Sequence, residues 1–443
     1  MMHPKPQFLI AAPSSDSGKT TITLGLLKAF ANRRLKVQPF KCGPDYIDPL
    51  LHQKACGAPS INLDTFMAGS KHVTTIYNRY LQQSDIGIVE GVMGLFDGAD
   101  KMKGSSAEIA ILLGLPVILV INARAMAYSA AALIYGFKNF NPELKIAGII
   151  FNNVNTISHY NILEDACKDV EVEVLGYLPT QQDIKIPSRH LGLSIASDIN
   201  FDELCNKIAI SISETVDLDR LLQLSTRNTI QEVVGTKSPK KGNYTIAIAL
   251  DDAFRFTYHE NLEVLKQFGE IVFFSPLTDA ALPACDLLYL AGGYPELFVE
   301  QLGQNTTMLK SVREYCLNNG KTYAECGGMM YLGQYIIDRQ GNQFEMAGFL
   351  PLATSMEKPA LHLGYRSLFI NDLNIKGHEF HYSACIELNG IEKLNCNIYN
   401  AKGVDVPSNM YLKNRTLASY NHLYWGDEQT FIEKLLQDSF YIN

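Results

Sequence analysis

The sequence lacks the cysteine patterns of zinc-binding and disulfide-stabilised proteins. Its nine cysteines are spread over 443 residues, and the closest pair, Cys316 and Cys326, is ten residues apart. Without a Cys-x-x-Cys pair or a Cys/His cluster, neither a zinc ribbon nor a disulfide framework is expected. Sparse, unpaired thiols are typical of a reducing compartment, so we expect a cytoplasmic protein.

The sequence also lacks an excess of basic residues and a long apolar run. Lys and Arg number 38 against 46 Asp and Glu, a balance that argues against a general nucleic-acid or anionic-membrane binder. The most apolar run, Ile109–Ile121, contains Gly114 and Pro116 and predicts a helix end, a turn and a buried strand. The first residues do not resemble a secretory signal. We therefore expect neither a nucleic-acid nor a membrane partner; the oligomeric state stays undecided, with a homodimer left open.

What the sequence does contain is material for buried cores, since 47% of its residues are apolar. In the first half, short apolar strands alternate with periodic helical stretches such as Thr20–Asn32 and Tyr128–Phe137. This alternation predicts a parallel sheet with helices on both faces, whose ligands bind at the carboxyl ends of the strands. The predicted strands are Phe8–Ala12, Val37–Phe40, Ile86–Val89, Pro116–Ile121 and Ile146–Phe151.

A polar, basic stretch near residues 225–243 interrupts this pattern and is typical of an interdomain linker. A second strand-first pattern follows it. We therefore predict an α/β protein of two doubly wound domains, residues 1–228 and 244–443, joined by a linker at 229–243. The strands predicted in the second domain are Tyr244–Ala249, Ile271–Phe274, Leu287–Leu290 and Lys321–Ala324.

A phosphate-binding loop is predicted directly after the first strand. Gly18-Lys19-Thr20 supplies the core of a P-loop, in which backbone amides and a helix N-terminus surround phosphate. The lysine neutralises phosphate oxygens, and the adjacent hydroxyl binds Mg²⁺. Position 13 is proline where the strict pattern has its first glycine, so an ordinary serine-rich turn capping a helix is the alternative. The candidate ATP-binding residues are Ser17, Gly18, Lys19, Thr20 and Thr21.

Acidic residues follow the ends of two other predicted strands. Glu90 ends the strand Ile86–Val89, a position suited to holding Mg²⁺ against a triphosphate, and Asp97 lies in the loop beyond it. The strand Val37–Phe40 leads into a loop with Asp45 and Asp48. Each acid alone is more often a solvated loop residue, but together at one sheet edge they indicate metal or substrate binding. The candidate metal ligands are Thr20, Glu90 and Asp45.

A second reactive centre is predicted at Cys326, which stands between the strand Lys321–Ala324 and the pair Gly327-Gly328. Such a strand–turn–helix frame is a nucleophile elbow, in which a sharp turn exposes the sulfur and the helix N-terminus favours the thiolate. Most of the nine cysteines are better interpreted as small buried hydrophobes. Gly292 and Gly293 follow another strand, and their amides are suited to an oxyanion hole.

The thiol needs a base, and His422 and the pair His378/His381 are the candidates. The pair lies in His-Glu-Phe-His, but a spacing of three on a strand points the two rings to opposite faces, so a zinc site is not expected.

Taken together, these motifs resemble the cobyrinic acid a,c-diamide synthase family over nearly the whole chain. The first domain is similar to a dethiobiotin-synthetase-type P-loop domain, and the second to a class I glutamine amidotransferase. The Gly-Pro-Asp-Tyr-Ile-Asp stretch favours this branch over the related cobyric acid synthases. The resemblance rests on five segments in family order: Ser17–Thr21, Lys41–Pro49, Glu90–Gly98, Gly292–Glu296 and Gly377–Ser383.

The resemblance implies an ATP-binding amidoligase domain at 1–228 and a glutaminase domain at 244–443. It implies that Cys326 is the glutaminase nucleophile and that His422 raises its reactivity. Position 424 is Tyr, so the usual His-x-Glu of class I amidotransferases is absent, and the group that orients His422 is not identified. The remaining implied roles are ATP and Mg²⁺ binding by Lys19, Thr20 and Glu90, adenine contact by Asn152, and corrinoid or nucleotide contact by Asp45, Asp48 and Asp97.

The resemblance also implies the reaction: ATP and Mg²⁺ activate the a and c acetate carboxylates of cobyrinic acid as acyl phosphates, and glutamine supplies the ammonia. The same chemistry on hydrogenobyrinic acid or nickel-sirohydrochlorin is an alternative, because the motifs barely separate these substrates. A P-loop switch ATPase with an inert amidotransferase-like module is the alternative from another class.

Overall fold

The computed structural model describes residues 4–180, 201–228 and 242–440. The chain divides into two compact units, the first comprising residues 1–65 and 69–235, the second residues 66–68 and 236–443. Nearly all of the stretch that we predicted as a linker, 229–243, lies outside the described residues.

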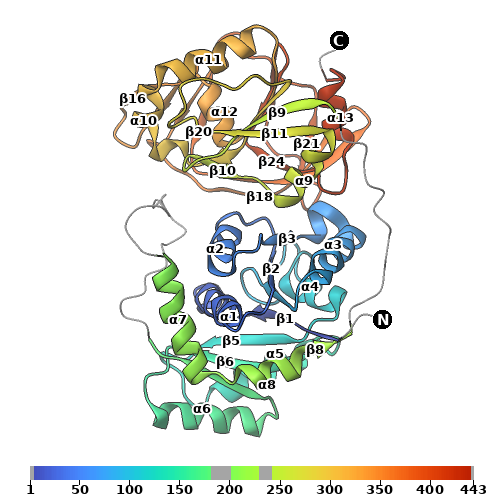
Figure 1. Ribbon diagram of the computed structural model, residues 1–443, viewed down its shortest axis with the longest axis vertical. Helices are drawn as coiled ribbons and strands as arrows, with labels where there is room; N and C mark the ends of the chain where they lie inside the picture. Colours follow the sequence, from blue (N-terminus) through green and yellow to red (C-terminus); the bar gives the residue numbers. More distant parts are fainter. Residues whose placement is uncertain (1–3, 181–200, 229–241, 441–443) are drawn as a thin grey trace. The chain divides into compact units, whose positions relative to one another are not determined.

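The first unit is built on one sheet whose strand order is β3-β2-β4-β1-β5-β6-β7, with the short β8 antiparallel beside β1 (Figure 1). The seven strands of this path run parallel. Because β2, β4 and β1 are neighbours, three loops that are far apart in the sequence leave the same edge of the sheet side by side. The strands are β1 (Lys5–Ala11), β2 (Val37–Cys42), β3 (Ile61–Leu63), β4 (Ile86–Glu90), β5 (Val117–Asn122), β6 (Ile146–Asn152), β7 (Val174–Leu178) and β8 (Thr226–Arg227).

Helices cover both faces of this sheet, as the alternating pattern predicted. Apolar residues of α1, α2, α7 and α8 share one buried cluster with Phe8 and Ile10 of β1. The helices α3 to α6 connect successive strands toward the other edge, and right-handed crossovers place them on the opposite face. The helices are α1 (Lys19–Asn32), α2 (Ile47–Cys56), α3 (Thr65–Gln82), α4 (Ser106–Leu113), α5 (Ala130–Phe140), α6 (Ile157–Asp169), α7 (Phe201–Thr215) and α8 (Leu218–Ser225).

The apolar run Ile109–Ile121 forms the elements predicted for it. The helix α4 ends at Leu113, Gly114 adopts a left-handed φ of 61°, and β5 begins at Val117. Among the helices that the structure describes, none is long and apolar enough to cross a bilayer.

The second unit contains a six-stranded sheet with the order β11-β9-β12-β14-β23-β22, of which β22 alone runs antiparallel. Two further four-stranded sheets, β21-β18-β19-β24 and β16-β15-β17-β20, accompany it. The larger strands are β9 (Tyr244–Ala249), β11 (Gly269–Phe274), β12 (Leu287–Leu290), β14 (Lys321–Glu325), β17 (Leu352–Ser355), β18 (His362–Ile370), β19 (Leu373–His381), β20 (Ala384–Glu387), β21 (Asn397–Asn400), β22 (Met410–Lys413), β23 (Thr416–Ser419) and β24 (Asn421–Tyr424).

Short strands and helices complete this unit. The strands β10 (Phe254–Phe256) and β13 (Gly292–Gly293), which follow β9 and β12 in the chain, form a two-stranded antiparallel pair. The other elements are β15 (Tyr335–Ile337), β16 (Gln343–Glu345), α9 (His259–Phe268), the 3-10 helix η1 (Pro295–Leu297), α10 (Val299–Gln304), α11 (Thr306–Leu317), α12 (Gly327–Leu332) and α13 (Thr430–Leu436). The predicted α/β fold, with a parallel sheet in the first unit and a second sheet-based unit after it, is confirmed.

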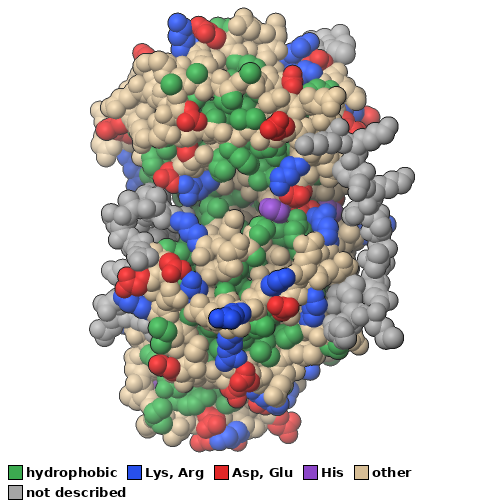
Figure 2. Space-filling model, viewed as in Figure 1, with side chains coloured by type: hydrophobic (Ala, Val, Ile, Leu, Met, Phe, Trp, Pro, Cys, Tyr) green, Lys and Arg blue, Asp and Glu red, His purple; other side chains and the backbone are tan. Residues whose placement is uncertain are grey.

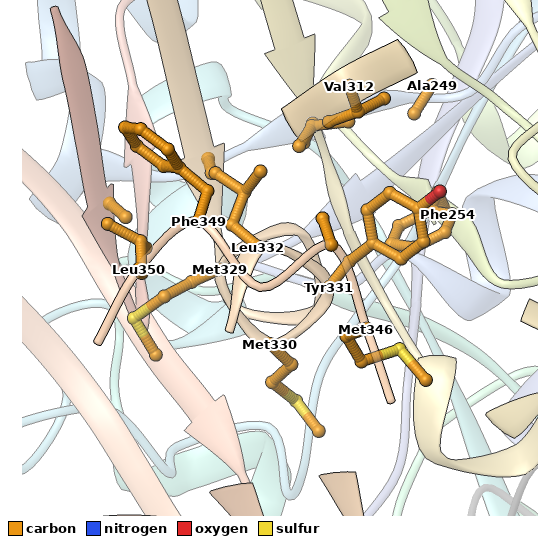
Figure 3. Packing of buried hydrophobic residues seen from close by; sticks show 14 of the residues in the cluster. Ala249, Phe254, Val312, Met329, Met330, Tyr331, Leu332, Met346, Phe349 and Leu350 are labelled. Carbon is orange, nitrogen blue, oxygen red and sulfur yellow. The ribbon is translucent and has the colours of Figure 1, made fainter. Parts of the chain in front are cut away.

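The core of the second unit surrounds α12, whose six residues are all buried. Figure 3 shows Met329, Tyr331 and Leu332 of this helix among side chains from several other elements. The Tyr331 ring packs edge-on against Phe254, with 5.4 Å between ring centroids. A helix held this firmly fixes the turn that precedes it.

The surface is mixed in charge. On the face drawn in Figure 2, acidic and basic side chains are interspersed, in keeping with the net charge of −8.

Candidate active site

The loop between β1 and α1 has the backbone that a P-loop requires. Asp16 and Gly18 both adopt left-handed conformations, with φ of 59° and 98°. A Cβ atom on Gly18 would lie 2.1 Å from Nδ2 of Asn152, so a side chain at position 18 has no room. Asn152 Nδ2 donates a hydrogen bond to the Ser17 carbonyl at 3.1 Å. Asn152, for which we predicted an adenine contact, therefore supports the loop itself in this structure.

Lys19 joins the loop after β1 to the loop after β4. Its ammonium group donates to the carbonyl oxygen of Met93 at 2.6 Å and to that of Ser14 at 3.3 Å. Met93 itself adopts a left-handed φ of 50°. A positive charge is thus held between two loops at the carboxyl edge of the sheet, where phosphate oxygens of a nucleotide would need it. Thr21 lies in the first turn of α1.

Glu90 is the centre of a buried polar network. Its Oε1 accepts hydrogen bonds from the Thr20 hydroxyl at 2.8 Å and from the Lys41 ammonium at 3.0 Å. Lys41 and Glu90 are register partners on β2 and β4, and neither side chain is exposed. Lys41 also contacts Asp48 at 2.5 Å. Because a buried ammonium is costly unless it is paired, these carboxylates account for its presence in the core.

The three aspartates that we predicted near the substrate have different surroundings. Asp45 accepts hydrogen bonds from the backbone amides of Ile47 and Asp48, at 2.9 and 3.0 Å, and so begins α2. Asp48 is buried against Lys41. Asp97 is exposed, and its carboxylate accepts from the Gly94 amide at 3.0 Å.

The residues around Thr20 fit a magnesium–nucleotide complex better than an all-protein metal site. Within residues 4–180, 201–228 and 242–440, no three His, Cys, Asp or Glu side chains form a group that could hold a metal ion. Mg²⁺ usually takes one or two protein oxygens and fills the remaining positions with phosphate and water. The Thr20 hydroxyl and the Glu90 carboxylate, whose oxygens lie 2.8 Å apart, are suited to supply these one or two protein oxygens. Asp45, our third predicted ligand, uses one carboxylate oxygen to begin α2.

Sequence reasoning missed His52 and Ser60. His52 contacts the Glu90 carboxylate, and Ser60 contacts His52. The His52 Nε2 lies 2.6 Å from Glu90 Oε2, and its Nδ1 lies 3.0 Å from the Ser60 hydroxyl. Both residues are buried. A histidine on the helix after the Asp45–Asp48 loop was the only available signal, and nothing in its spacing indicated this contact.

Replacing His52 should weaken only the amidoligase activity that the family resemblance implies for the first unit. We expect His52→Ala to lower the rate of ammonia-dependent amidation about tenfold to a hundredfold, because Glu90 loses a partner that fixes its carboxylate. His52→Gln retains a donor near Nε2 and should restore part of the rate. His159→Ala, on α6, is the matched control. Steady-state assays that show equal rates for His52→Ala and His159→Ala would contradict the role given to His52.

In the second unit, Cys326 occupies the sharp turn that we predicted. It joins β14 to α12 with φ 46° and ψ −103°, a strained conformation for a residue with a side chain. The Cys326 amide donates to the Ser419 carbonyl at 2.7 Å, and the Cys326 carbonyl accepts from the Met330 amide at 3.0 Å. Strain held by such bonds is typical of a nucleophile elbow.

Two parts of that prediction are wrong. Cys326 is only 3% exposed, so the turn does not present the sulfur to solvent. Burial and the negative charge of Glu296 raise the pKa of the Cys326 thiol well above its usual value, and a hydrogen bond from the Gly327 amide opposes this only in part. Burial thus favours the neutral thiol over the thiolate, so the predicted attack requires a base that takes the thiol proton.

Gly292 and Gly293, predicted for the oxyanion hole, lie against His422 and the turn at Cys326. A Cβ atom on Gly292 would lie 2.2 Å from Cε1 of His422, so glycine is needed for the imidazole to fit. A Cβ atom on Gly327, next to the nucleophile, would lie 3.0 Å from the Gly293 amide nitrogen. The elbow, the glycine pair and His422 therefore converge in one place.

His422 lies on β24, directly opposite His378 on β19, and the two rings stack with 4.9 Å between centroids. Burial, with the neighbouring His378 and His381, lowers the pKa of His422 well below 6.5. A neutral imidazole at ordinary pH is able to accept the thiol proton.

Of the other candidate bases, His378 is buried against the Tyr258 hydroxyl at 2.8 Å, and burial lowers its pKa to about 3. His381 instead stacks on Tyr420, 3.6 Å between centroids, and contacts Glu379 at 3.0 Å. The structure thus places His422, rather than His381, beside the glycine pair.

Sequence reasoning also missed Glu325, which precedes the nucleophile. Its buried carboxylate accepts hydrogen bonds from the hydroxyls of Tyr289 and Tyr323, at 2.8 and 2.9 Å. The position of Glu325 directly before the predicted nucleophile Cys326 was visible in the sequence, but only the fold shows which residues its carboxylate contacts.

Family comparisons agree with this division of the chain. Residues 8–193 match the CobQ/CobB/MinD/ParA nucleotide binding domain, and residues 245–430 match the CobB/CobQ-like glutamine amidotransferase domain. Fold and sites together define the class: a P-loop nucleotide-binding unit joined to a glutamine amidotransferase unit, as in glutamine-hydrolysing carbon–nitrogen ligases.

Relatives that align along almost the full length make the assignment more specific. The chain is 42% identical to a cobyrinate a,c-diamide synthase of Picrophilus torridus, covering 98% of both chains. It is 37% identical to the enzyme of that name from Salmonella typhimurium, covering 97% of both, and 39% identical to that of Streptococcus sanguinis, covering 96% of this chain and 97% of the relative. The chain belongs to the cobyrinate a,c-diamide synthase family.

Proposed function

We propose that this protein is an ATP-dependent, glutamine-hydrolysing ligase that amidates the a and c acetate carboxylates of cobyrinic acid in cobalamin biosynthesis. In this proposal the first unit, residues 1–228, activates the carboxylate, and the second, residues 244–443, releases ammonia from glutamine. The observation that carries it is the full-length alignment with cobyrinate a,c-diamide synthases of a chain holding both a P-loop and a nucleophile elbow.

In the ligase half, oxide is too poor a leaving group for direct amidation, so the carboxylate first takes the γ-phosphoryl group of ATP. Catalysis then depends on positioning and on neutralising charge. Lys19 and the loop amides around Gly18 would hold the phosphates. Thr20 and Glu90 would hold Mg²⁺, which shields the charge of the triphosphate when bound. The exposed Asp97 is the aspartate best placed to contact a large polar substrate.

In the glutaminase half, Cys326 attacks the side-chain carbonyl of glutamine while its proton passes to His422. The backbone amides at Gly292 and Gly293 would stabilise the oxyanion of the tetrahedral intermediate. His422 then gives the proton to the departing ammonia, and water hydrolyses the thioester to glutamate. Ammonia reacts with the acyl phosphate to give the amide and inorganic phosphate.

Mass spectrometry of the products tests the substrate. With ATP, Mg²⁺ and glutamine, we expect cobyrinic acid to lose about 1 Da per amidation, two amidations in all, with one ADP and one glutamate formed each time. Hydrogenobyrinic acid and nickel-sirohydrochlorin are the comparison substrates. Preference for either of these would reassign the tetrapyrrole, whereas ATP hydrolysis without any amide product would favour a switch ATPase.

A further inference from the structure

The imidazole of His422 has two acidic residues within its surroundings, although position 424, where class I amidotransferases usually have a glutamate, is Tyr. One is Glu325, whose Oε2 lies 4.0 Å from His422 Nδ1. The other is Glu379, which influences the pKa of His422 through its charge. A histidine base works best when an acidic partner fixes its ring and stabilises the imidazolium that forms.

Glu379 already contacts Arg366 and His381. Its Oε2 accepts from Arg366 Nε at 2.7 Å, and its Oε1 lies 3.0 Å from His381 Nε2. The stacked neighbour His378 is not acidic and cannot stabilise an imidazolium. Glu325 is therefore the carboxylate that the structure directs toward the base.

Two hydrogen bonds from other strands hold Glu325 between the segments that carry the predicted catalytic groups. Oε1 accepts from the Leu423 amide at 2.8 Å, and Leu423 follows His422 on β24. The Tyr289 hydroxyl, on the strand that leads to Gly292, donates to Oε2 at 2.8 Å. Glu325 itself ends β14 and precedes Cys326. One buried carboxylate thus ties together the strands of the nucleophile, the base and the oxyanion glycines.

We infer that Glu325 is the positioning residue of the glutaminase site and takes the place of the missing glutamate after His422. The inference rests on the proposed glutaminase role of Cys326 and His422. The carboxylate favours the imidazole tautomer with its proton on Nδ1, leaving the other nitrogen to accept the thiol proton. Glu325 stays ionised while its charge stabilises the transient imidazolium. The 4.0 Å separation is of the kind that shortens when the substrate complex forms.

The inference predicts a pH dependence. Burial raises the pKa of Glu325 to about 7, so its charge is present above that pH and is lost below it. The pKa of His422 is lowered well below 6.5 and that of Cys326 is raised well above 9.0, so neither titrates near neutrality. Glutamine hydrolysis should therefore rise as the pH increases through 7. The titratable groups that face Glu325, Cys326 and His422 are Tyr289, Glu296, Tyr323, His378, Glu379, His381 and Tyr420.

Glu325→Gln in the full-length protein tests the inference. The amide keeps the shape of the side chain and can still bond both tyrosines, but it carries no charge. We expect kcat for glutamine hydrolysis to fall at least about a hundredfold and the rise through pH 7 to disappear. Amidation with added ammonium salt should keep its wild-type rate, which also shows that the protein is folded.

Two further variants test whether this role belongs to Glu325 alone. Glu387→Gln alters another carboxylate that accepts a tyrosine hydroxyl, from Tyr411 at 2.9 Å, and should retain wild-type hydrolysis. Burial also raises the pKa of Glu296 to about 7, so Glu296→Gln should keep the rise through pH 7 if Glu325 is its source. Wild-type kcat in Glu325→Gln, or a rise that disappears only in Glu296→Gln, would overturn the inference. Absent hydrolysis in the wild-type enzyme would instead refute the proposed function.

Discussion

Cys326→Ala is expected to abolish the use of glutamine and to leave amidation by ammonia intact. Without the sulfur no thioester forms, so glutamine-dependent amide formation should fall at least about a thousandfold. Alanine is smaller than cysteine, so it should fit the strained backbone conformation between β14 and α12 at least as well. Product formation with glutamine, and separately with ammonium chloride, measures the two activities.

Cys396→Ala is the control, since Cys396 is a free thiol of the same unit that is partly buried, whereas Cys326 is buried. It should retain both activities. Loss of ammonia-dependent amidation in a folded Cys326→Ala protein would show that the two units do not divide the reaction as proposed.

Lys19→Ala should have the opposite selectivity: amidation stops with either nitrogen source. The ammonium group is the charge held between the loops after β1 and β4, and its removal leaves the developing phosphate charge without a partner. We expect a loss of about a hundredfold to a thousandfold in amide and ADP formation. Basal glutamine hydrolysis by Cys326 should continue.

Lys28→Ala removes the same charge from the same helix and is the control, because Lys28 forms an ion pair with Asp202 at 2.6 Å. Its amidation rate should match that of the wild-type protein. A comparable loss in both variants would mean that charge on α1 in general, rather than Lys19, is required.

Much of the parallel framework was predictable because buried strands read as continuous apolar runs. The run Leu287–Leu290 is β12 as predicted, and Phe8–Ala12 differs from β1 by a few residues at its start. The hairpin of β18 and β19 was not predicted, although the segment His378–His381 was interpreted as part of a strand. The alternating burial of these strands and the turn at Asn371-Asp372, with a left-handed φ of 53° at Asn371, were the available signals of a hairpin.

The site was predictable where a motif carries its own chemistry, as at Lys19 and Cys326. It was not predictable where partners come from distant segments. Lys41, His52 and Glu325 act through contacts set by strand order, and no spacing in the sequence shows that β2 lies beside β4. The burial of Cys326 likewise results from packing in the core. A turn motif predicts the direction of the backbone, but it does not predict whether the side chain is accessible to solvent.

A single residue, Tyr420, separates β23 from β24, and this short connection passes from one sheet to another. The nucleophile is anchored beside β23 through the Ser419 carbonyl, whereas the base belongs to the neighbouring sheet. The distance between the Cys326 sulfur and the His422 imidazole consequently depends on the position of one sheet relative to the other. A small displacement of one sheet against the other would therefore change the geometry of the predicted proton transfer.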